Sequence, residues 1–305
     1  MAQKKKTKKK AQEKTDTNTS NINWFPGHMT KAKRQMEENM KKVDFVIEIR
    51  DARIPVSSKN PMIDELIGNK PRLIILSKKD KADPQKTREW IDYFRNDHQM
   101  AVALDLIRDS YKNTIIESGE KLCAALIEKQ KRRGINPRAL RAMVCGIPNV
   151  GKSTFINTLA KRKAAQTGDR PGVTKSLQWI KLDKAIELLD TPGVLWPKFE
   201  GEYVGERLAL LGSIRDEVVT QDDLAFYGCK WLMENDPQAL AAAYGIELQD
   251  TPYDTLLEIG RKRGYLQKGA VDENRLMRSF VKDIRENKIG RITWESVHDQ
   301  PSSRD

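Results

Sequence analysis

The segment Gly146–Thr154 (GIPNVGKST) constrains the fold of this chain more than any other part of the sequence. It follows the short apolar run Arg141–Cys145 and opens a helical stretch over Lys152–Lys161. A G-x-x-x-x-G-K-[ST] pattern between a strand and a helix predicts a loop whose backbone N–H groups and helix N-terminus surround a polyphosphate. The sequence therefore predicts an α/β domain with a phosphate-binding loop at the end of a strand.

The residues of this loop have different expected roles. Lys152 is expected to reach the β- and γ-phosphates of a nucleotide, and the Ser153 hydroxyl is expected to bind Mg²⁺. The nucleotide contacts predicted in the loop are Asn149, Val150, Gly151, Lys152, Ser153 and Thr154.

A second motif, Asp190-Thr191-Pro192-Gly193, ends the apolar run AIELLD. In nucleotide switches a carboxylate at this position holds Mg²⁺ through water, and the following glycine N–H senses the γ-phosphate. We expect these roles for Asp190 and Gly193. Between the two motifs, Thr174 of the string RPGVT is expected to complete the Mg²⁺ coordination; the alternative is an ordinary loop hydroxyl.

The string Ser77-Lys78-Lys79-Asp80 follows the apolar run Arg72–Leu76 and is similar to the [NT]-K-x-D element that reads guanine. Asp80 would accept hydrogen bonds from guanine N1 and N2, an edge that adenine lacks, and Lys78 would lie along the base. Ser77 replaces the Asn that usually joins this element to the phosphate loop, which predicts a reduced nucleotide affinity. A charged loop without a ligand is the alternative. Asp105 and Leu106, after the next strand, are expected to supply the last base contact.

The order of these motifs is unusual, because the base-reading string precedes the phosphate loop instead of following it. This order indicates a circularly permuted GTPase. The segment after Gly193 then runs through Val194–Gly205 into the last third of the chain, so the state of the γ-phosphate could move that region directly.

Short apolar runs alternate with helical stretches up to about residue 200, which predicts a mostly parallel α/β sheet. The expected strands are Val43–Ile49, Arg72–Leu76, Ala101–Leu104 and Arg141–Cys145, with SLQWIKL and AIELLD as an antiparallel pair. The expected helices of this part are Thr30–Met40, Asn60–Ile67, Pro84–Arg95, Asn113–Arg133 and Lys152–Lys161. Beyond residue 200 only helices are expected, at Glu202–Gly212, Gln221–Glu234, Pro237–Tyr244, Pro252–Arg263 and Asp272–Lys288. The predicted organisation is a disordered basic tail (1–20), a GTPase domain (21–200), a small all-α domain (201–295) and a final tail (296–305).

Charge is unevenly distributed along the chain. The net charge is +12, which divides into +5 for residues 1–20, +12 for 21–200 and −5 for 201–305. The first segment is either a solubilising tail or an electrostatic arm for nucleic acid. No apolar run approaches the roughly 20 residues of a membrane-spanning helix, and the N-terminus has no secretory apolar region. Three widely spaced cysteines exclude a disulfide framework, so a cytoplasmic protein is expected.

Five strings together carry a resemblance to a known family: WFPGHM, DARIP, GIPNVGKST, GDRPGVT and LLDTPGVLWPK. In this order they resemble the bacterial ribosome biogenesis GTPase A family, the YlqF type of circularly permuted GTPases, over residues 22–295. The resemblance implies a protein that binds GTP and the large (50S) ribosomal subunit, with its 23S rRNA and its proteins. It also implies late subunit assembly, faster GTP hydrolysis on the ribosome, and a helical domain that contacts ribosomal RNA. A monomer is expected.

Catalysis is not explained by the usual residue, because Val194 stands where small GTPases carry the Gln that positions water. The resemblance implies His28 instead, which would orient the attacking water or accept its proton; a surface or RNA-contacting histidine is the alternative. In permuted and related GTPases an Asn at position 149 is associated with K⁺, so K⁺ is expected beside Mg²⁺. The alternative is that Asn149 merely favours a turn after Pro148.

The last expected helix has a basic face opposite an apolar one. The basic residues are Arg275, Arg278, Lys282 and Arg285, and they are expected to point away from the domain. They are either a solvated surface or a surface for ribosomal RNA phosphates. The expected function is a GTPase for large-subunit assembly. The alternatives are an RNA-binding scaffold that uses guanine nucleotide as an affinity switch, and a P-loop enzyme acting on adenine nucleotides or a small substrate.

Overall fold

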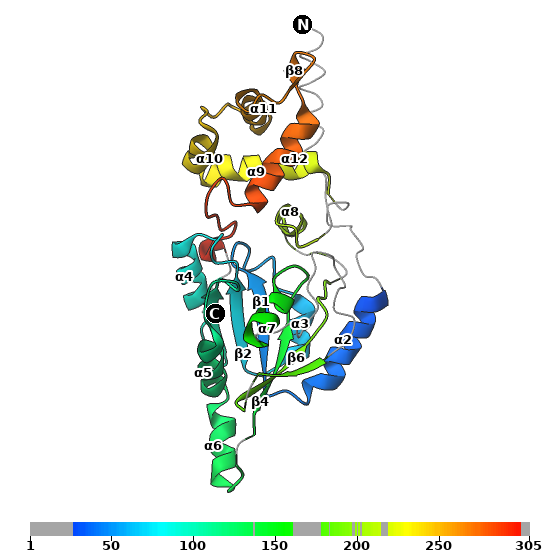
Figure 1. The fold of residues 1–305 in the computed structure, drawn as a ribbon, viewed down its shortest axis with the longest axis vertical. Helices are drawn as coiled ribbons and strands as arrows, with labels where there is room; N and C mark the ends of the chain where they lie inside the picture. Colours follow the sequence, from blue (N-terminus) through cyan, green and yellow to red (C-terminus); the bar gives the residue numbers. More distant parts are fainter. Residues whose placement is uncertain are drawn as a thin grey trace.

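The computed structural model describes residues 27–136, 138–160, 178–182, 184–196, 199, 201, 203–214 and 219–299, with side chains from residue 30. An α/β domain occupies one part of the molecule and a helical domain lies beyond the carboxyl ends of its strands (Figure 1). No helix in these described ranges combines the length and the apolar character needed to cross a membrane.

The α/β domain is built on one six-stranded sheet with the order β3-β2-β1-β4-β6-β5. All neighbouring pairs are parallel except β5 with β6, as expected for this class. The strands are β1 (Phe45–Asp51), β2 (Arg72–Ser77), β3 (Gln99–Leu104), β4 (Leu140–Cys145), β5 (Gln178–Lys181) and β6 (Ile186–Asp190). Burial on both faces explains the continuous apolar runs of the central strands. The order also fits the permutation, since the strand that leads into the phosphate loop lies between β1 and β6.

Helices cover the sheet at the positions that the sequence predicts, with one exception. They are α2 (Gly27–Met40), α3 (Pro61–Ile67), α4 (Pro84–Tyr93), α5 (Lys112–Leu122), α6 (Ala124–Arg132) and α7 (Lys152–Ala160). The single helix expected over Asn113–Arg133 is wrong. It is divided at Cys123, a buried residue whose φ of −101° and ψ of 14° end α5 and start α6.

The second domain is helical. Its helices are α8 (Val204–Leu210), α9 (Gln221–Asn235), α10 (Pro237–Tyr244), α11 (Pro252–Lys262) and α12 (Glu273–Arg285). Four of them begin at side chains that accept a hydrogen bond from the first turn: Thr220, Asp236, Thr251 and Asp272. These caps explain the clear helix starts in the sequence. The expectation of helices alone needs one correction, because a short hairpin, β7 (Leu266–Gln267) with β8 (Ala270–Val271), separates α11 from α12.

The chain returns to the α/β domain after α12. The Ile292 N–H donates to the Lys81 carbonyl, and the Trp294 N–H donates to the Arg53 carbonyl. A short helix, η2 (Val297–Asp299), then lies against α4, and Figure 1 shows it in red beside that helix. Residues 291–299 therefore pack on the first domain, although the sequence predicts that 201–295 forms one helical unit.

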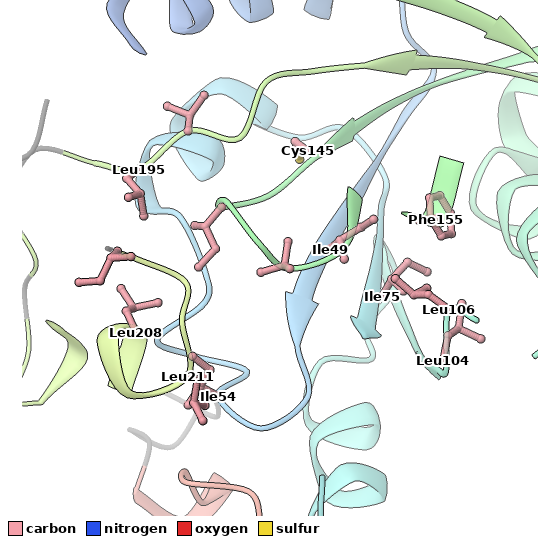
Figure 2. Packing of buried hydrophobic residues seen from close by; sticks show 14 of the residues in the cluster. Ile49, Ile54, Ile75, Leu104, Leu106, Cys145, Phe155, Leu195, Leu208 and Leu211 are labelled. Atoms are coloured by element: carbon pink, nitrogen blue, oxygen red, sulfur yellow. The ribbon is translucent and has the colours of Figure 1, made fainter. Parts of the chain in front are cut away.

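One apolar core joins the two domains. It extends from the sheet through the loop after β6 into α8. Figure 2 labels members of this core from separate segments: Leu208 of α8, Leu211 directly after it, Ile54 from the loop after β1 and Leu195 from the segment after β6. All four side chains are buried. The first helix of the second domain is thus fixed to the same side of the sheet as the phosphate loop.

Candidate nucleotide-binding site

The carboxyl ends of four parallel strands meet at one edge of the sheet. Strand β4 leads into the loop Gly146–Gly151, β6 ends at Asp190, β2 ends at Ser77 and β3 leads to Asp105. Ligands of open α/β sheets bind outside this edge where the strand order reverses. Here the chain reverses between β1 and β4, directly beside the loop. The fold therefore brings together motifs that are far apart in the sequence.

Two glycines of the loop are required by its geometry. Gly146 has a φ of +148°, and a Cβ there would collide with the Ile49 carbonyl of β1. Gly151 has a φ of +101°, and a Cβ there would lie 2.7 Å from Cδ1 of Leu106. Both positions combine a backbone that favours glycine with a close neighbour. The loop is held tightly between β1 and the segment after β3.

Lys152 and Asp190 form the charged centre of the site. The buried Lys152 ammonium donates to the Ile147 carbonyl at 2.6 Å. Burial lowers the pKa of Lys152 to about 8, and the charge of Asp190 opposes this shift. Burial raises the pKa of Asp190 to about 6, and the charge of Lys152 opposes that shift. Each residue therefore stabilises the charged form of the other.

The Asp190 carboxylate fits a cation site. Its Oδ1 atom is buried and has no hydrogen-bond partner among the described residues. A buried carboxylate oxygen without a donor is unfavourable unless a cation or water satisfies it. Oxygen ligands of this kind suit Mg²⁺, and Ser153 supplies a hydroxyl from the first turn of α7.

Gly193 lies directly against the phosphate loop. A Cβ at this position would lie 2.8 Å from Nζ of Lys152 and 3.1 Å from Cα of Pro148. The segment is also fixed by the buried Thr191, whose hydroxyl donates to the Val144 carbonyl of β4 at 2.7 Å. The switch motif is therefore close enough to the loop for its backbone to respond to a phosphate bound there.

Ser77 joins the base-reading string to the phosphate loop. Its buried hydroxyl lies 2.7 Å from the Val150 carbonyl and 2.9 Å from the Arg50 carbonyl. The serine hydroxyl therefore makes a link to the phosphate loop where an Asn usually does, and the reduced nucleotide affinity expected from this replacement stays a prediction.

The other residues of the string point in different directions. Lys78 has a left-handed backbone with a φ of 57°, and its ammonium lies 2.8 Å from Oδ2 of Asp51. Lys79 forms an ion pair of 2.6 Å with Asp109. Asp80 is exposed at the tip of the turn, as a residue that reads a bound base must be.

Leu106 and Asp105 have different surroundings. Leu106 is buried against Gly151, and its carbonyl accepts a hydrogen bond from the Thr158 hydroxyl of α7 at 3.0 Å. The Asp105 carboxylate accepts from the backbone N–H groups of Ile107 and Arg108 at 3.0 and 3.1 Å, which closes the turn after β3. Both residues border the loop, and the Asp105 side chain is used within its own turn.

Asn149 connects the loop to the helical domain. Its backbone is left-handed, with a φ of 60°, and its Nδ2 atom donates to the Gly212 carbonyl just after α8 at 2.9 Å. An asparagine amide also carries an oxygen acceptor, which this bond does not use.

The structure describes only some of the remaining predicted residues. Thr174 and the His28 side chain lie outside the described residues, and the backbone of His28 belongs to the first turn of α2. On α12, Arg275, Arg278 and Lys282 are exposed, whereas the apolar face is buried. The expectation that Arg285 points outward is wrong. Its guanidinium donates to the Leu210 and Ala209 carbonyls at 2.9 and 2.8 Å and so caps α8.

A buried charged cluster beside the base-reading string was not assigned by the sequence motifs. Asp51 is fully buried and binds Arg53 through two hydrogen bonds of 2.9 and 2.7 Å in addition to Lys78. These cations hold the pKa of Asp51 well below its usual range, against the effect of burial. The string DARIP contains Asp51 and Arg53, but only the fold shows that Asp51 contacts Lys78.

The fold and the site define a P-loop GTPase. The chain is 47% identical over 278 residues to ribosome biogenesis GTPase A from Bacillus pumilus, a match that covers 90% of this chain and 98% of that protein. The chain belongs to the ribosome biogenesis GTPase A family. A family model described as "50S ribosome-binding GTPase" matches residues 141–253, which start at β4 and exclude the permuted segment with Ser77.

More distant relatives support the same family. The protein named ribosome biogenesis GTPase A from Thermotoga maritima is 32% identical over 279 residues, covering 91% of this chain and 95% of that protein. The solved structure of GNP-bound YlqF from T. maritima is 28% identical with a TM-score of 0.58, covering 87% of this chain and 98% of that chain.

Proposed function

We propose that this GTPase binds a precursor of the large ribosomal subunit, including its 23S rRNA, and promotes a late step of its assembly. The observation that carries the proposal is the direct contact between the phosphate loop and the helical domain. Asn149 of the phosphate loop binds the Gly212 carbonyl just after α8, and Arg285 of α12 binds the Leu210 and Ala209 carbonyls at the end of α8, so both elements are bonded to the same helix end. A conformational change in the phosphate loop can then be transmitted through α8 to α12, which carries the exposed basic face. The family model described as a 50S ribosome-binding GTPase and the relatives' names, which refer to ribosome biogenesis, support this choice of partner.

In the proposed site the residues of the chain bind and orient GTP. Lys152 neutralises charge on the β- and γ-phosphates, and Ser153, Thr174 and, through water, Asp190 hold Mg²⁺, which stabilises the charge that develops on the phosphates. The phosphates are contacted from the phosphate loop by Asn149, Val150, Gly151 and Thr154, and from the switch motif by Gly193. The base site is formed or supported by six residues: Ser77, Lys78, Lys79, Asp80, Asp105 and Leu106.

Hydrolysis needs a residue other than Val194, which is buried and apolar. We assign the orientation of the attacking water to His28. The free oxygen of the Asn149 amide is assigned to K⁺, which would add positive charge at the transition state. Both groups would act fully only when the subunit orders the site, so hydrolysis is stimulated by the subunit and depends on K⁺.

Arg275, Arg278 and Lys282 are the residues proposed to meet ribosomal RNA phosphates. The protein would act as a cytoplasmic monomer. The alternative of an affinity switch with little hydrolysis is favoured by one observation, the absence of a hydrogen-bonding side chain at Val194.

Steady-state GTP hydrolysis with purified large subunits or their precursors tests the proposal. We expect a turnover that rises with subunit concentration, is higher in K⁺ than in Na⁺ and returns nearly to the basal level in His28→Ala. His298→Ala is the matched control, because His298 is exposed near the far end of the chain. Tight GTP-dependent binding without stimulated turnover would support the scaffold instead, and hydrolysis of ATP at a similar rate would exclude a guanine-specific enzyme.

A further inference from the structure

The loop that carries Asp80 is bound by residues 291–293, which follow the helical domain. Residues 291–293 run beside the loop Lys78–Asp83 after the chain has left α12. They come from a part of the sequence more than two hundred positions away, and none of the nucleotide motifs includes them.

Arg291 makes the most specific of these contacts. Its Nη2 atom donates to the Lys79 carbonyl at 2.8 Å, and its Nε atom donates to the Ala82 carbonyl at 3.0 Å. The two carbonyls lie on either side of Asp80 in the sequence. One planar guanidinium therefore fixes the distance between the two ends of the turn.

Neighbouring atoms extend the same contact. The Ile292 N–H donates to the Lys81 carbonyl at 3.1 Å, and the Asp83 N–H donates to the Thr293 hydroxyl at 3.0 Å. All four bonds use the backbone of the loop. They leave the Asp80 side chain exposed and available for a ligand.

The turn has one short backbone bond of its own, from the Lys81 N–H to the Lys78 carbonyl at 2.9 Å, and its other features hold it less firmly. Lys78 holds a left-handed backbone that is unfavourable for a residue with a Cβ. The bond that closes the turn from the Ala82 N–H to the Lys79 carbonyl is 3.4 Å long, and the bond from the Lys79 N–H to the Leu104 carbonyl is 3.5 Å long. Bonds of this length hold a loop less firmly than the 2.8 Å contact from Arg291.

We propose that Arg291 is a positioning residue for guanine recognition, which holds the backbone around Asp80 in the geometry that accepts the guanine edge. This inference rests on the proposed role of Asp80. A lysine at this position could reach one carbonyl but could not bridge two in a fixed geometry. The specificity of the nucleotide site is thus completed by a segment that follows the helical domain.

The test uses full-length Arg291→Ala and Arg291→Lys, measured by GDP and IDP binding and by GTP turnover. IDP lacks the N2 amino group, so the ratio of GDP to IDP affinity reports how well the Asp80 carboxylate is aligned. We expect Arg291→Ala to raise the KM for GTP and the Kd for GDP about tenfold. The preference for GDP over IDP is expected to shrink, while kcat at saturating GTP stays close to that of the parent. Arg291→Lys is expected to recover only part of the affinity.

The controls separate this role from a purely structural one. Arg261→Ala removes an exposed arginine of α11 that pairs with Glu258, and it should change neither the KM nor the GDP-to-IDP ratio. An unchanged ratio in both Arg291 variants, measured well below their unfolding temperatures, would overturn the inference. Asp80→Asn tests the underlying assignment: if it does not shift preference from GTP toward XTP, the base-reading role fails. If it does shift and the Arg291 variants do not, only the positioning role fails.

Discussion

Asn149 of the phosphate loop and Gly212 at the end of α8 are joined by a hydrogen bond of 2.9 Å between Nδ2 and the carbonyl oxygen. The bond connects the residue assigned to K⁺ with the first helix of the second domain. Replacing Asn149 should therefore affect both stability and the response to cations.

We expect Asn149→Ala to lower the free energy of unfolding by about 2 kcal/mol, because it loses one hydrogen bond and keeps an unfavourable left-handed backbone. Asn149→Gly loses the same bond but adopts a φ of 60° without strain. The glycine variant should recover roughly half of the loss, as measured by urea unfolding. Both variants should lose the difference between K⁺ and Na⁺ in subunit-stimulated turnover. A retained K⁺ effect would contradict the assignment of the cation to Asn149.

Mg²⁺ binding should weaken in mild acid because the pKa of Asp190 is raised to about 6. Below this pH the carboxylate is increasingly protonated, and Mg²⁺ affinity measured with bound GDP should fall up to tenfold per pH unit. Asp190→Asn should show weak binding with little dependence on pH between 5 and 7. A parent affinity that is constant over this range would show that Asp190 is not the titrating ligand.

Without nucleotide, the raised pKa of Asp190 should make the folded protein more stable as the pH falls, whereas Mg²⁺ binding weakens over the same range. The folded protein binds a proton on Asp190 more tightly than the unfolded chain does, because its pKa is raised from 3.8 to about 6. The contribution of this residue to the free energy of unfolding should increase as the pH falls from about 6 to about 4. The difference between the parent and Asp190→Asn, measured by urea unfolding at each pH, isolates this contribution.

Ser77→Ala should reduce nucleotide affinity because it removes the hydroxyl between the Val150 and Arg50 carbonyls. A lost buried hydrogen bond of this kind corresponds to about 1 kcal/mol, or a Kd for GDP raised roughly fivefold. Ser110→Ala, at an exposed position after β3, is the matched control. Equal GDP affinity in both variants would mean that the link does not hold the loop in its binding geometry.

Glu295 is expected to hold the end of the chain against the first domain. Its buried carboxylate accepts from the Val56 N–H at 2.6 Å and the Ser57 N–H at 2.9 Å, and it also binds the Ser57 hydroxyl and Arg207. Burial raises the pKa of Glu295, although these partners oppose the shift. Glu295→Ala leaves the donors unsatisfied and should lower stability by about 3 kcal/mol. Glu295→Gln keeps two acceptor sites on its oxygen and should lose less, as measured by urea unfolding and proteolysis near the C-terminus.

Arg278 and Arg285 lie on the same helix but should behave differently. Arg278→Glu should weaken co-sedimentation with large subunits and reduce its salt dependence, because Arg278 is exposed. Arg285→Ala should instead lower stability by about 1–2 kcal/mol through the loss of the α8 cap. Unchanged co-sedimentation of Arg278→Glu at low salt would exclude this face as the RNA surface.

The sequence predicts the parts of this fold that depend on local patterns. The phosphate loop, the strand that ends at Asp190 and the helix starts at Thr220 and Asp272 each have a short signature, and the structure contains all of them. The failures concern contacts between distant segments. The periodicity of α12 places Arg285 on a polar face, but only the packing shows that the end of α8 lies there. Cys123 divides a helical pattern because its backbone departs from helical values, which no residue type in this segment indicates.

The return of residues 291–299 to the sheet gives the helical domain two covalent connections to the GTPase domain, one through the segment after β6 and one through Arg291–Glu295. The domain is an insertion attached at both of its ends, unlike a terminal appendage with a single connection. A truncation at residue 200 would remove more than that domain. It would also expose Trp90, which donates to the Glu295 carbonyl, and the backbone around Ser57. A deletion that tests the helical domain alone must therefore excise its interior and rejoin the chain before Arg291.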